Sequence, residues 1–429
     1  MPTKDGNFGR RTYLKGAGAA GAVALTGLAG CNGGDGGDTS SSSTTGGTSS
    51  SDSGSETITI GATVPETGAY SALGDDFKRG YQLGVKLMNQ NMDQNVELVL
   101  KDDESDAQKV RSTLQQIVSN NDVDMLWGSF SSLLVTAGSA YAEQQGIPFV
   151  GTAFAYMAPH QDNNYEWTYA AMPKSKGVAQ ATKGMLELIP ESERPSKIGI
   201  WEPNTGWGNE QANYWEDTLG GDYDIALREK YSLGAKDFST LISKSQSAGV
   251  EVLLSVPVPP GAITAVKQMA SQGWTPKAIQ FVRGADPSAF RSALGKNATG
   301  VTMCPGWVPG LTGNGNAALT KMARENYDEY SQGQLLPVMI GASFNVAQVA
   351  QQAFQNAGGT SPTDVQSALR STDFETVIGN FSFSDNGLPQ GLEAPIGQWY
   401  EGAQHLAYPA TDADAAIDFQ YPLTPFGER

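Results

Sequence analysis

The fold is decided by the stretch Ile58–Asn89, ITIGATVPETGAYSALGDDFKRGYQLGVKLMN. Its first residues alternate between apolar and small or polar side chains and stop at Pro65, which predicts a β-strand. A loop of Gly, Pro and small polar residues follows and contains Tyr70. The next residues to share one helical face are Phe77, Tyr81, Gly84, Val85 and Met88. A strand that enters a helix through such a loop is half of a βαβ unit, and ligands of these units bind at the carboxyl ends of the strands.

The same alternation continues to about residue 172. Further strands are expected at residues 96–102, 123–128 and 146–151, with helices at 105–121 and from Ser131 onward. Ser105 and Asp106 are both candidates for the N-cap of the first of these helices. In the second helix, the residues expected to face the core are Leu133, Ala137, Ala140 and Tyr141. Short connections between such elements predict parallel strands and right-handed crossovers, and thus an α/β lobe.

A second α/β series begins after Pro195. Its expected strands include KIGIWE at 197–202, AIQFV at 278–282 and VEVLLSVP at 250–257, which is apolar enough to be buried on both faces. Two of its loops stand at strand ends, one with Trp207 and one with Arg283 and Asp286. The chain is therefore predicted to hold two doubly wound lobes.

The junction Gly128–Ser132 carries three hydroxyls at the predicted start of a helix. Free backbone N–H groups and the helix dipole make such a position suitable for a carboxylate or another anion. Two interpretations are open, because Ser131 or Ser132 could bind a ligand or could only cap its own helix.

Residues 1–31 are typical of an export signal. Arg10–Lys15, RRTYLK, resembles the twin-arginine signal, and a short apolar run leads to Leu28–Cys31, which looks like a lipobox whose Cys31 thiol becomes lipidated. Residues 32–55 contain only Gly, Ser, Thr, Asp and Asn, which predicts a disordered tether. We therefore expect the protein on the extracellular face of the cell membrane, anchored by lipid on Cys31 and exported by the twin-arginine route.

The formal net charge of −17 and the absence of a basic cluster argue against nucleic acid as a partner. The acidic residues are dispersed along the chain, which favours solubility in high salt, and we expect a halophilic, archaeal source. Cys304 is the one cysteine left after Cys31, so no intramolecular disulfide is expected.

Enzyme and cofactor signatures are weak. His160 and His405 are the only histidines and stand far apart, so a histidine-based zinc site or a Ser-His-Asp triad is not expected. Gly313–Ala318 matches GxGxxA, but no predicted strand precedes it, so no dinucleotide cofactor is expected either.

The order of the segments PETGAYSALGDDFKRGYQLGVKLMN, VELVLKDDESDAQKV, MLWGSFSS and QGIPFVG resembles the type I periplasmic binding proteins. Within that family it is most similar to the branched-chain amino-acid group that serves ABC importers. The likeness runs from residue 56 to about 425 and includes TDFETVIGNFSFSDNGLP near the last hinge. It implies two doubly wound Rossmann-like lobes joined by three hinge crossings. The expected division is 56–175 with about 306–378 for lobe 1, and 176–305 with about 379–429 for lobe 2.

The resemblance also implies a ligand site between the lobes. The positions that it assigns to ligand binding are Tyr70, Ser131, Ser132, Thr152, Ala153, Phe154, Ala155, Trp207, Arg283 and Asp286. Relatives that bind amino acids usually have Ser-Ala-Thr where this chain has Ala153–Ala155, and an acidic residue near Ala285 that meets the ligand's ammonium group. Both departures argue against a standard α-amino acid as the ligand. Arg283 could pair with a carboxylate, and Phe154 with Trp207 could sandwich an apolar body.

The expected function is capture of a small molecule for an ABC permease and ATPase complex, without catalysis. The ligand class implied by the resemblance is an amino acid, most often branched-chain, or a related carboxylate or amide. A sensory protein of the same fold that signals through a membrane receptor is the alternative. An extracellular enzyme is the weaker rival, since a pair of carboxylates across a cleft could act as a glycosidase.

Overall fold

The computed structural model describes residues 57–429. The expected export signal, the tether and the lipidation site Cys31 lie outside the described residues. Among the described helices, none combines the length and apolar character needed to cross a membrane.

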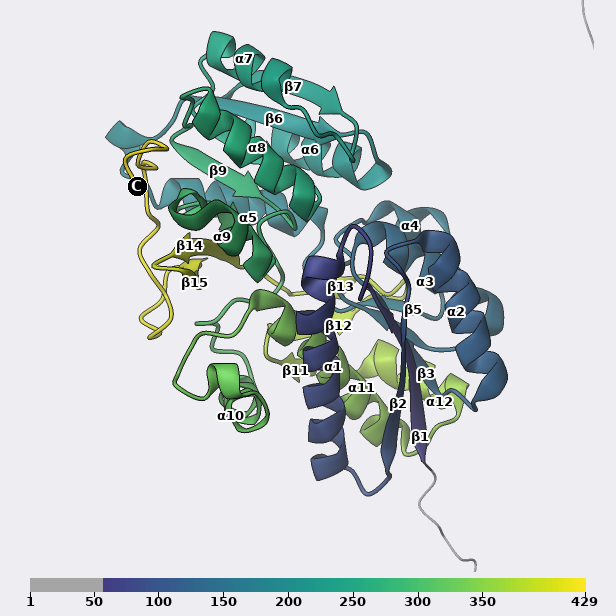
Figure 1. Ribbon diagram of the computed structural model, residues 1–429. Coiled ribbons are helices and arrows are strands. Elements are labelled where there is room, and N and C mark those ends of the chain that lie inside the picture. The colour runs from purple at the N-terminus through teal and green to yellow at the C-terminus, as the bar shows by residue number, and fades with distance from the viewer. Residues whose placement is uncertain (1–56) are drawn as a thin grey trace, which may run out of the picture. The chain divides into compact units, whose positions relative to one another are not determined.

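The first lobe is built on a parallel sheet in the order β2-β1-β3-β4-β5 (Figure 1). Its strands are β1 Ile58–Val64, β2 Val96–Asp102, β3 Met125–Trp127, β4 Phe149–Gly151 and β5 Thr168–Ala170. The helices between them are α1 Ser71–Asn91, α2 Ala107–Asn120, α3 Ser132–Gln145 and α4 Ala158–Asp162. Figure 1 shows α1 on one side of this sheet and α2 and α3 on the other. The predicted strand, loop and helix of residues 58–89 are confirmed, with the helix starting earlier, at Ser71.

Later segments return to this lobe. They are α10 Asn316–Asn326, α11 Val338–Ala357, α12 Pro362–Ser371 and a small antiparallel sheet of β11 Phe374–Thr376, β12 Gly379–Phe383 and β13 Pro389–Gln390, with a 3-10 turn η3 at Asp328–Tyr330. Helix α11 packs along α1, where Gly84 lies against Ala347 and Gly80 against Ser343. The two glycines allow the helix backbones to approach closely.

The second lobe is a seven-stranded sheet in the order β15-β14-β10-β9-β8-β6-β7. Its strands are β6 Lys197–Pro203, β7 Asp224–Tyr231, β8 Val252–Ser255, β9 Ala278–Phe281, β10 Thr302–Met303, β14 Ile396–Tyr400 and β15 Ala403–Tyr408. Its helices are α5 Ser175–Glu187, α6 Gly206–Leu219, α7 Ser239–Ala248, α8 Pro259–Ser271 and α9 Ser288–Leu294, with 3-10 turns η1 Glu191–Glu193 and η2 Gly295–Ala298. The first five strands in sequence pair in parallel, whereas β14 runs antiparallel to β10 and β15.

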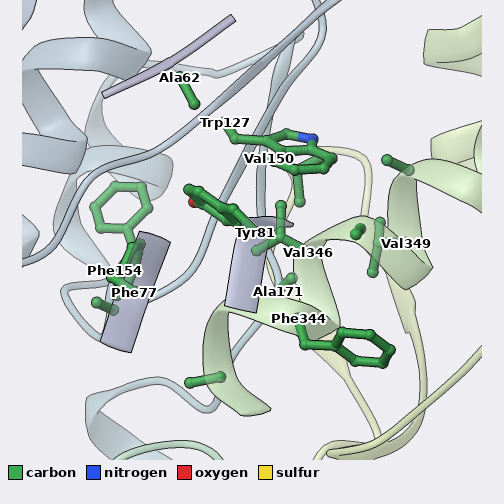
Figure 2. Close-up of a cluster of buried hydrophobic side chains, with 14 of the residues drawn as sticks. Ala62, Phe77, Tyr81, Trp127, Val150, Phe154, Ala171, Phe344, Val346 and Val349 are labelled. Atoms are coloured by element: carbon green, nitrogen blue, oxygen red, sulfur yellow. The ribbon is translucent and has the colours of Figure 1, made fainter. Parts of the chain in front are cut away.

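The hydrophobic core of the first lobe spans both of its chain segments. Tyr81 of α1 packs on Trp127 of β3 with ring centroids 4.9 Å apart, and its hydroxyl donates to the Gly128 carbonyl. Figure 2 shows these two rings beside Val150 of β4 and Val346 of α11. Burial of these side chains contributes roughly 1.5–3 kcal/mol each, so the return of α11 is an integral part of the lobe.

The last crossing into the second lobe falls later than expected. β12 pairs with β11, and its Phe381 and Phe383 belong to the first hydrophobic cluster. Ala394 and Ile396 are the next residues in the core of the second lobe. The chain therefore passes between the lobes after Gln390 and not at residue 379, because two phenylalanines hold β12 against the first lobe.

Candidate ligand-binding site

A cavity of about 420 Å³ gathers the carboxyl ends of strands from both lobes. The first lobe contributes Tyr70 after β1, Ala107 after β2, Phe130 and Ser131 after β3, Tyr156 after β4, and Ser132, Leu133, Thr136, Ala137 and Ala140 of α3. The second lobe contributes Thr205, Gly206 and Trp207 after β6, Leu233 after β7, Val256, Pro257 and Val258 after β8, and Arg283 after β9. The volume lies within the ~300–1,000 Å³ of small-molecule sites. Another cavity, of about 470 Å³ under residues 407–421, gathers no such strand ends.

Ser131 is held in a conformation that non-glycine residues rarely adopt, with φ at +83°. Its hydroxyl accepts the N–H of Leu134 at 3.5 Å and is also hydrogen-bonded to Tyr70. Burial raises the pKa of Tyr70, and this hydrogen bond opposes the rise. Ser131 therefore caps α3 and lines the cavity, so the two roles proposed from the sequence coexist at one residue.

The loop with Tyr70 is tied to the end of β2. Asp106, one of the two candidate caps, caps α2 by accepting the N–H groups of Gln108 and Lys109 at 2.9 Å. This leaves the Ser105 hydroxyl free to donate to the Thr67 carbonyl and to accept the N–H of Tyr70. The neighbouring strand end therefore fixes the position of Tyr70.

The exposed face of α3 differs from the sequence prediction. Leu134 and Val135 are fully buried, whereas Leu133, which was expected to face the core, is 58% exposed. Leu133, Thr136, Ala137 and Ala140 instead line the cavity. Helical periodicity identifies an apolar face, but it does not distinguish a face packed on the sheet from one that lines a cavity.

The wall on the second lobe is built around Trp207. Thr205 caps α6 by accepting the N–H of Gly208 at 2.9 Å. The indole N–H of Trp207 donates to the Ser175 hydroxyl at 3.2 Å, which fixes the ring while it lines the cavity. The tryptophan therefore packs within its own lobe and is also available to a ligand.

Arg283 brings a positive charge to this wall although only 2% of its surface is exposed. Its Nη1 lies 3.3 Å from Oδ2 of Asp286, which does not line the cavity. Burial raises the pKa of Asp286 to about 6, and the Arg283 charge opposes the rise. Arg283 has a φ of +70°, so backbone strain, which is common at functional sites, occurs on both walls of the cavity.

The run after β4 lies behind the wall. Thr152, Ala153, Phe154 and Ala155 are buried, and none of them lines the cavity. The Phe154 ring packs on His160 at 4.9 Å between centroids, and the Lys174 ammonium lies 4.1 Å from its centre. The expected sandwich of Phe154 and Trp207 is therefore not formed in this arrangement. A direct ligand contact by these four residues or by Asp286 stays a prediction.

Contacts between the lobes border the cavity. Glu210 of α6 accepts the N–H groups of Met157 and Ala158, at the start of α4, at 2.8 and 2.9 Å. Nearby, the Tyr156 hydroxyl lies only 2.4 Å from where a Cβ at Gly206 would be. Sequence reasoning missed Tyr156 and Glu210. Tyr156 does follow a predicted strand, whereas nothing in the pattern identifies Glu210.

Within the described residues, no group of His, Cys, Asp and Glu side chains is arranged to hold a metal ion. His160 is buried in the first lobe, and its burial, together with the nearby Lys174 charge, holds its pKa well below the usual value. The arrangement instead provides hydroxyls, a helix N-terminus and one guanidinium around an apolar space. Two α/β lobes, each built on mainly parallel strands, with such a cavity between them define a two-lobed binding protein of the type I periplasmic class.

The chain belongs to the periplasmic binding protein family, whose sequence pattern it matches over residues 57–399. It is 26% identical over 391 residues to the Leu/Ile/Val-binding protein homolog 7 of Brucella abortus (strain 2308), covering 86% of this chain and 95% of that one. Both names describe binding proteins.

Solved structures agree with the fold. A putative branched-chain amino acid ABC transporter from Silicibacter pomeroyi matches with a TM-score of 0.71 and 21% identity, over 86% of this chain and 99% of that one. The leucine binding protein of Thermotoga maritima matches with a TM-score of 0.70 and 17% identity, over 81% and 97%. A benzoate complex of a solute binding protein from R. palustris matches with a TM-score of 0.69 and 17% identity, over 84% of this chain and 99% of that one. The type I fold expected from the sequence is thereby confirmed.

Proposed function

We propose that the protein is the extracellular, membrane-tethered solute-binding component of an ABC importer in a halophilic archaeon. It captures an amino acid, most often branched-chain, or a related carboxylate or amide, and delivers it to the permease and ATPase complex. The observation that carries the proposal is the cavity to which both lobes contribute strand ends, from Tyr70 and Ser131 on one side to Trp207 and Arg283 on the other.

The geometry supports capture of a ligand by closure of the two lobes. The chain crosses between the lobes three times, and closing such a hinge places a ligand out of water between the two walls. Both lobes supply contacts, so the ligand stabilises the closed arrangement only when both walls reach it. Similar proteins support the ligand class, since they include Leu/Ile/Val-binding proteins and a Streptococcus pneumoniae protein in complex with isoleucine.

A thermal-shift panel tests capture. The purified protein, residues 57–429, is titrated with each compound of a panel. The panel holds leucine, isoleucine, valine, aliphatic and aromatic carboxylates and small amides. At least one of them should raise the midpoint temperature of unfolding as its concentration rises. At a hundred times its dissociation constant the added free energy of unfolding should be about 2.7 kcal/mol. Trp207→Ala should weaken the response, because the ring lines the cavity.

Trp167→Ala serves as the matched control, since Trp167 is also only partly buried and lies outside the cavity. The proposal would be contradicted if no compound in the panel raised the unfolding temperature as its concentration increased. So would an equal loss of response in the two tryptophan variants.

The lipid anchor is a separate part of the proposal and rests on the lipobox-like Leu28–Cys31. Expressed in a haloarchaeal host, the wild-type protein should sediment with membranes and partition into a detergent phase. Cys31→Ser should appear in the soluble or secreted fraction, because the thiol that carries the lipid is gone. An unchanged membrane fraction for this variant would refute lipidation at Cys31.

A further inference from the structure

The charge distribution around the cavity is one-sided. Of the described residues that line it, Arg283 alone is charged, and none is an aspartate or a glutamate. Apart from the Trp207 indole N–H, which is bonded to Ser175, the remaining polar side-chain groups are hydroxyls. Ser131 and Ser132 stand at the N-terminus of α3. Both the helix dipole and the guanidinium favour a negative group in this space.

Arg283 has unused hydrogen-bonding capacity. A guanidinium has about five N–H donors, yet the recorded partners of this one are Asp286 at 3.3 Å and the Met172 sulfur at 3.5 Å, and its buried Nε has none. A thioether is a weak acceptor, so the side chain is only partly satisfied. An anionic oxygen that reaches the guanidinium from the cavity would replace the weak contact with the Met172 sulfur by a charge-assisted hydrogen bond.

An ammonium group has no comparable partner. Burying a charge without a counter-ion costs several kcal/mol, and hydroxyls offset only part of that cost. Arg283 would also repel a cation on the same wall. Asp286 cannot take the role from its present position, because it lies behind the wall with its Oδ2 on Arg283. For a zwitterionic α-amino acid, the cost of burying the ammonium group would therefore offset the favourable interaction of the carboxylate with Arg283.

The rest of the wall suits an apolar body. Leu133 and Ala137 face the cavity from the first lobe, and Trp207, Leu233 and Val258 face it from the second. Leu133 is one of only two large apolar side chains classed as exposed in the described chain, which is consistent with a surface that a ligand covers.

We propose that the ligand is an apolar monocarboxylate without an α-ammonium group, and that Arg283 is its anionic anchor. This inference rests on the proposed function and narrows its ligand class. Asp286 is the internal counter-ion of Arg283 while the cavity is empty of ligand, and the ligand carboxylate competes with it for the guanidinium.

Calorimetric titration with matched probes tests the inference without any variant. Leucine, 4-methylpentanoate and 3-methylbutylamine share one apolar skeleton. Leucine carries both charges, 4-methylpentanoate carries only the carboxylate, and 3-methylbutylamine carries only the ammonium group. Phenylalanine, 3-phenylpropanoate and 2-phenylethylamine form the aromatic set. In at least one set the carboxylate should bind at least tenfold more tightly than the amino acid, and the amines should not bind.

The outcomes distinguish failure of this inference from failure of the proposed solute-binding function. An amino acid that binds as tightly as its matched carboxylate, or more tightly, overturns the inference and leaves the solute-binding function standing. Binding of neither carboxylate also overturns it. If, in addition, nothing in the thermal-shift panel binds, the proposed function falls as well.

Variants then locate the anchor. Arg283→Met should weaken binding of the preferred carboxylate by about ten- to a hundredfold, as expected for a hydrogen bond to a charged group. Because this change leaves Asp286 buried without its partner, the double variant Arg283→Met/Asp286→Asn is made beside it and should show the same loss. Arg228→Met is the control, since Arg228 pairs with Glu202 and Glu216 outside the cavity. Equal binding in the wild type and the double variant would refute Arg283 as the anchor.

Discussion

Gly80→Ala is expected to destabilise the first lobe strongly, although alanine is the better helix former. A Cβ at this position would lie 1.9 Å from the Ser343 hydroxyl and 2.3 Å from the Ile340 carbonyl oxygen. The second of these atoms belongs to the backbone of α11, so relief requires the two helices to move apart. We expect the free energy of unfolding to fall by about 1–3 kcal/mol or more, against the gain of ~0.5–1 kcal/mol that alanine brings to an ordinary helix. Urea unfolding followed by tryptophan fluorescence measures the difference.

Two controls make this result specific to the contact between α1 and α11. Gly221→Ala should change stability by less than about 0.5 kcal/mol, since its Cβ would meet nothing within 4 Å. At Gly84 the single close neighbour is the Cβ of Ala347, at 2.3 Å. Gly84→Ala should therefore destabilise, and adding Ala347→Gly should recover much of the loss. A neutral or stabilising Gly80→Ala would show that the helices are not packed as closely as described.

Asp103 is expected to make the protein less stable as the pH rises from about 4 to 7. Burial raises the pKa of this carboxyl from 3.8 to about 6, although hydrogen bonds from Ser129 and the Ser105 N–H oppose the rise. Between these two pKa values the folded chain holds the proton that the unfolded chain has lost, so stability falls with pH across this window. A shift of this size corresponds to about 3 kcal/mol once both states are ionised.

The Asp103→Asn variant isolates this effect. Its free energy of unfolding minus that of the wild type should increase from about pH 4 to about pH 6 and then level off, whatever the constant offset from altered hydrogen bonds. Glu251 provides a control of opposite sign, because Lys277 and the Ser196 N–H lower its pKa to about 2 despite partial burial. The stability that Glu251 contributes is present above about 4.5 and lost as the pH falls toward 2. A flat difference for Asp103→Asn would rule out the buried carboxyl as the cause.

The sequence was sufficient for the elements around the site because their signals are local. The strand at Ile58 and the helix face of Phe77 and Tyr81 depend on neighbours a few residues away. The cap of α2 was narrowed to Ser105 or Asp106 in the same way, and the structure selects Asp106. Ser131 was a candidate because of its place at a predicted helix start, and Tyr70, Trp207 and Arg283 were assigned by resemblance. All four line one cavity.

What the sequence did not show depends on contacts between distant segments. Leu133 was expected in the core, and only the packing of α3 shows that its face is open to the cavity. Phe154 was assigned to the ligand site, and its ring packs on Lys174 and His160 outside the cavity lining, so its contact with a ligand stays a prediction. The late crossing after Gln390 has the same origin, because the pairing of β12 with β11 outweighs any signal in its own residues.

The bonds from Glu210 to the start of α4 have a consequence for how faithfully the protein reports its ligand. They join the two lobes without touching the cavity, so they must break whenever the lobes separate. At about 1 kcal/mol each, a value suited to a partly exposed carboxylate, they raise the ratio of closed to open molecules roughly thirtyfold over that of a chain without them. The fraction of closed molecules rises by the same factor while that fraction is small. The same factor tightens apparent affinity for every ligand alike. Glu210 thus raises sensitivity to every solute equally and leaves the preference among solutes unchanged. In the proposed transport role, its cost would be a larger share of closed but unloaded molecules.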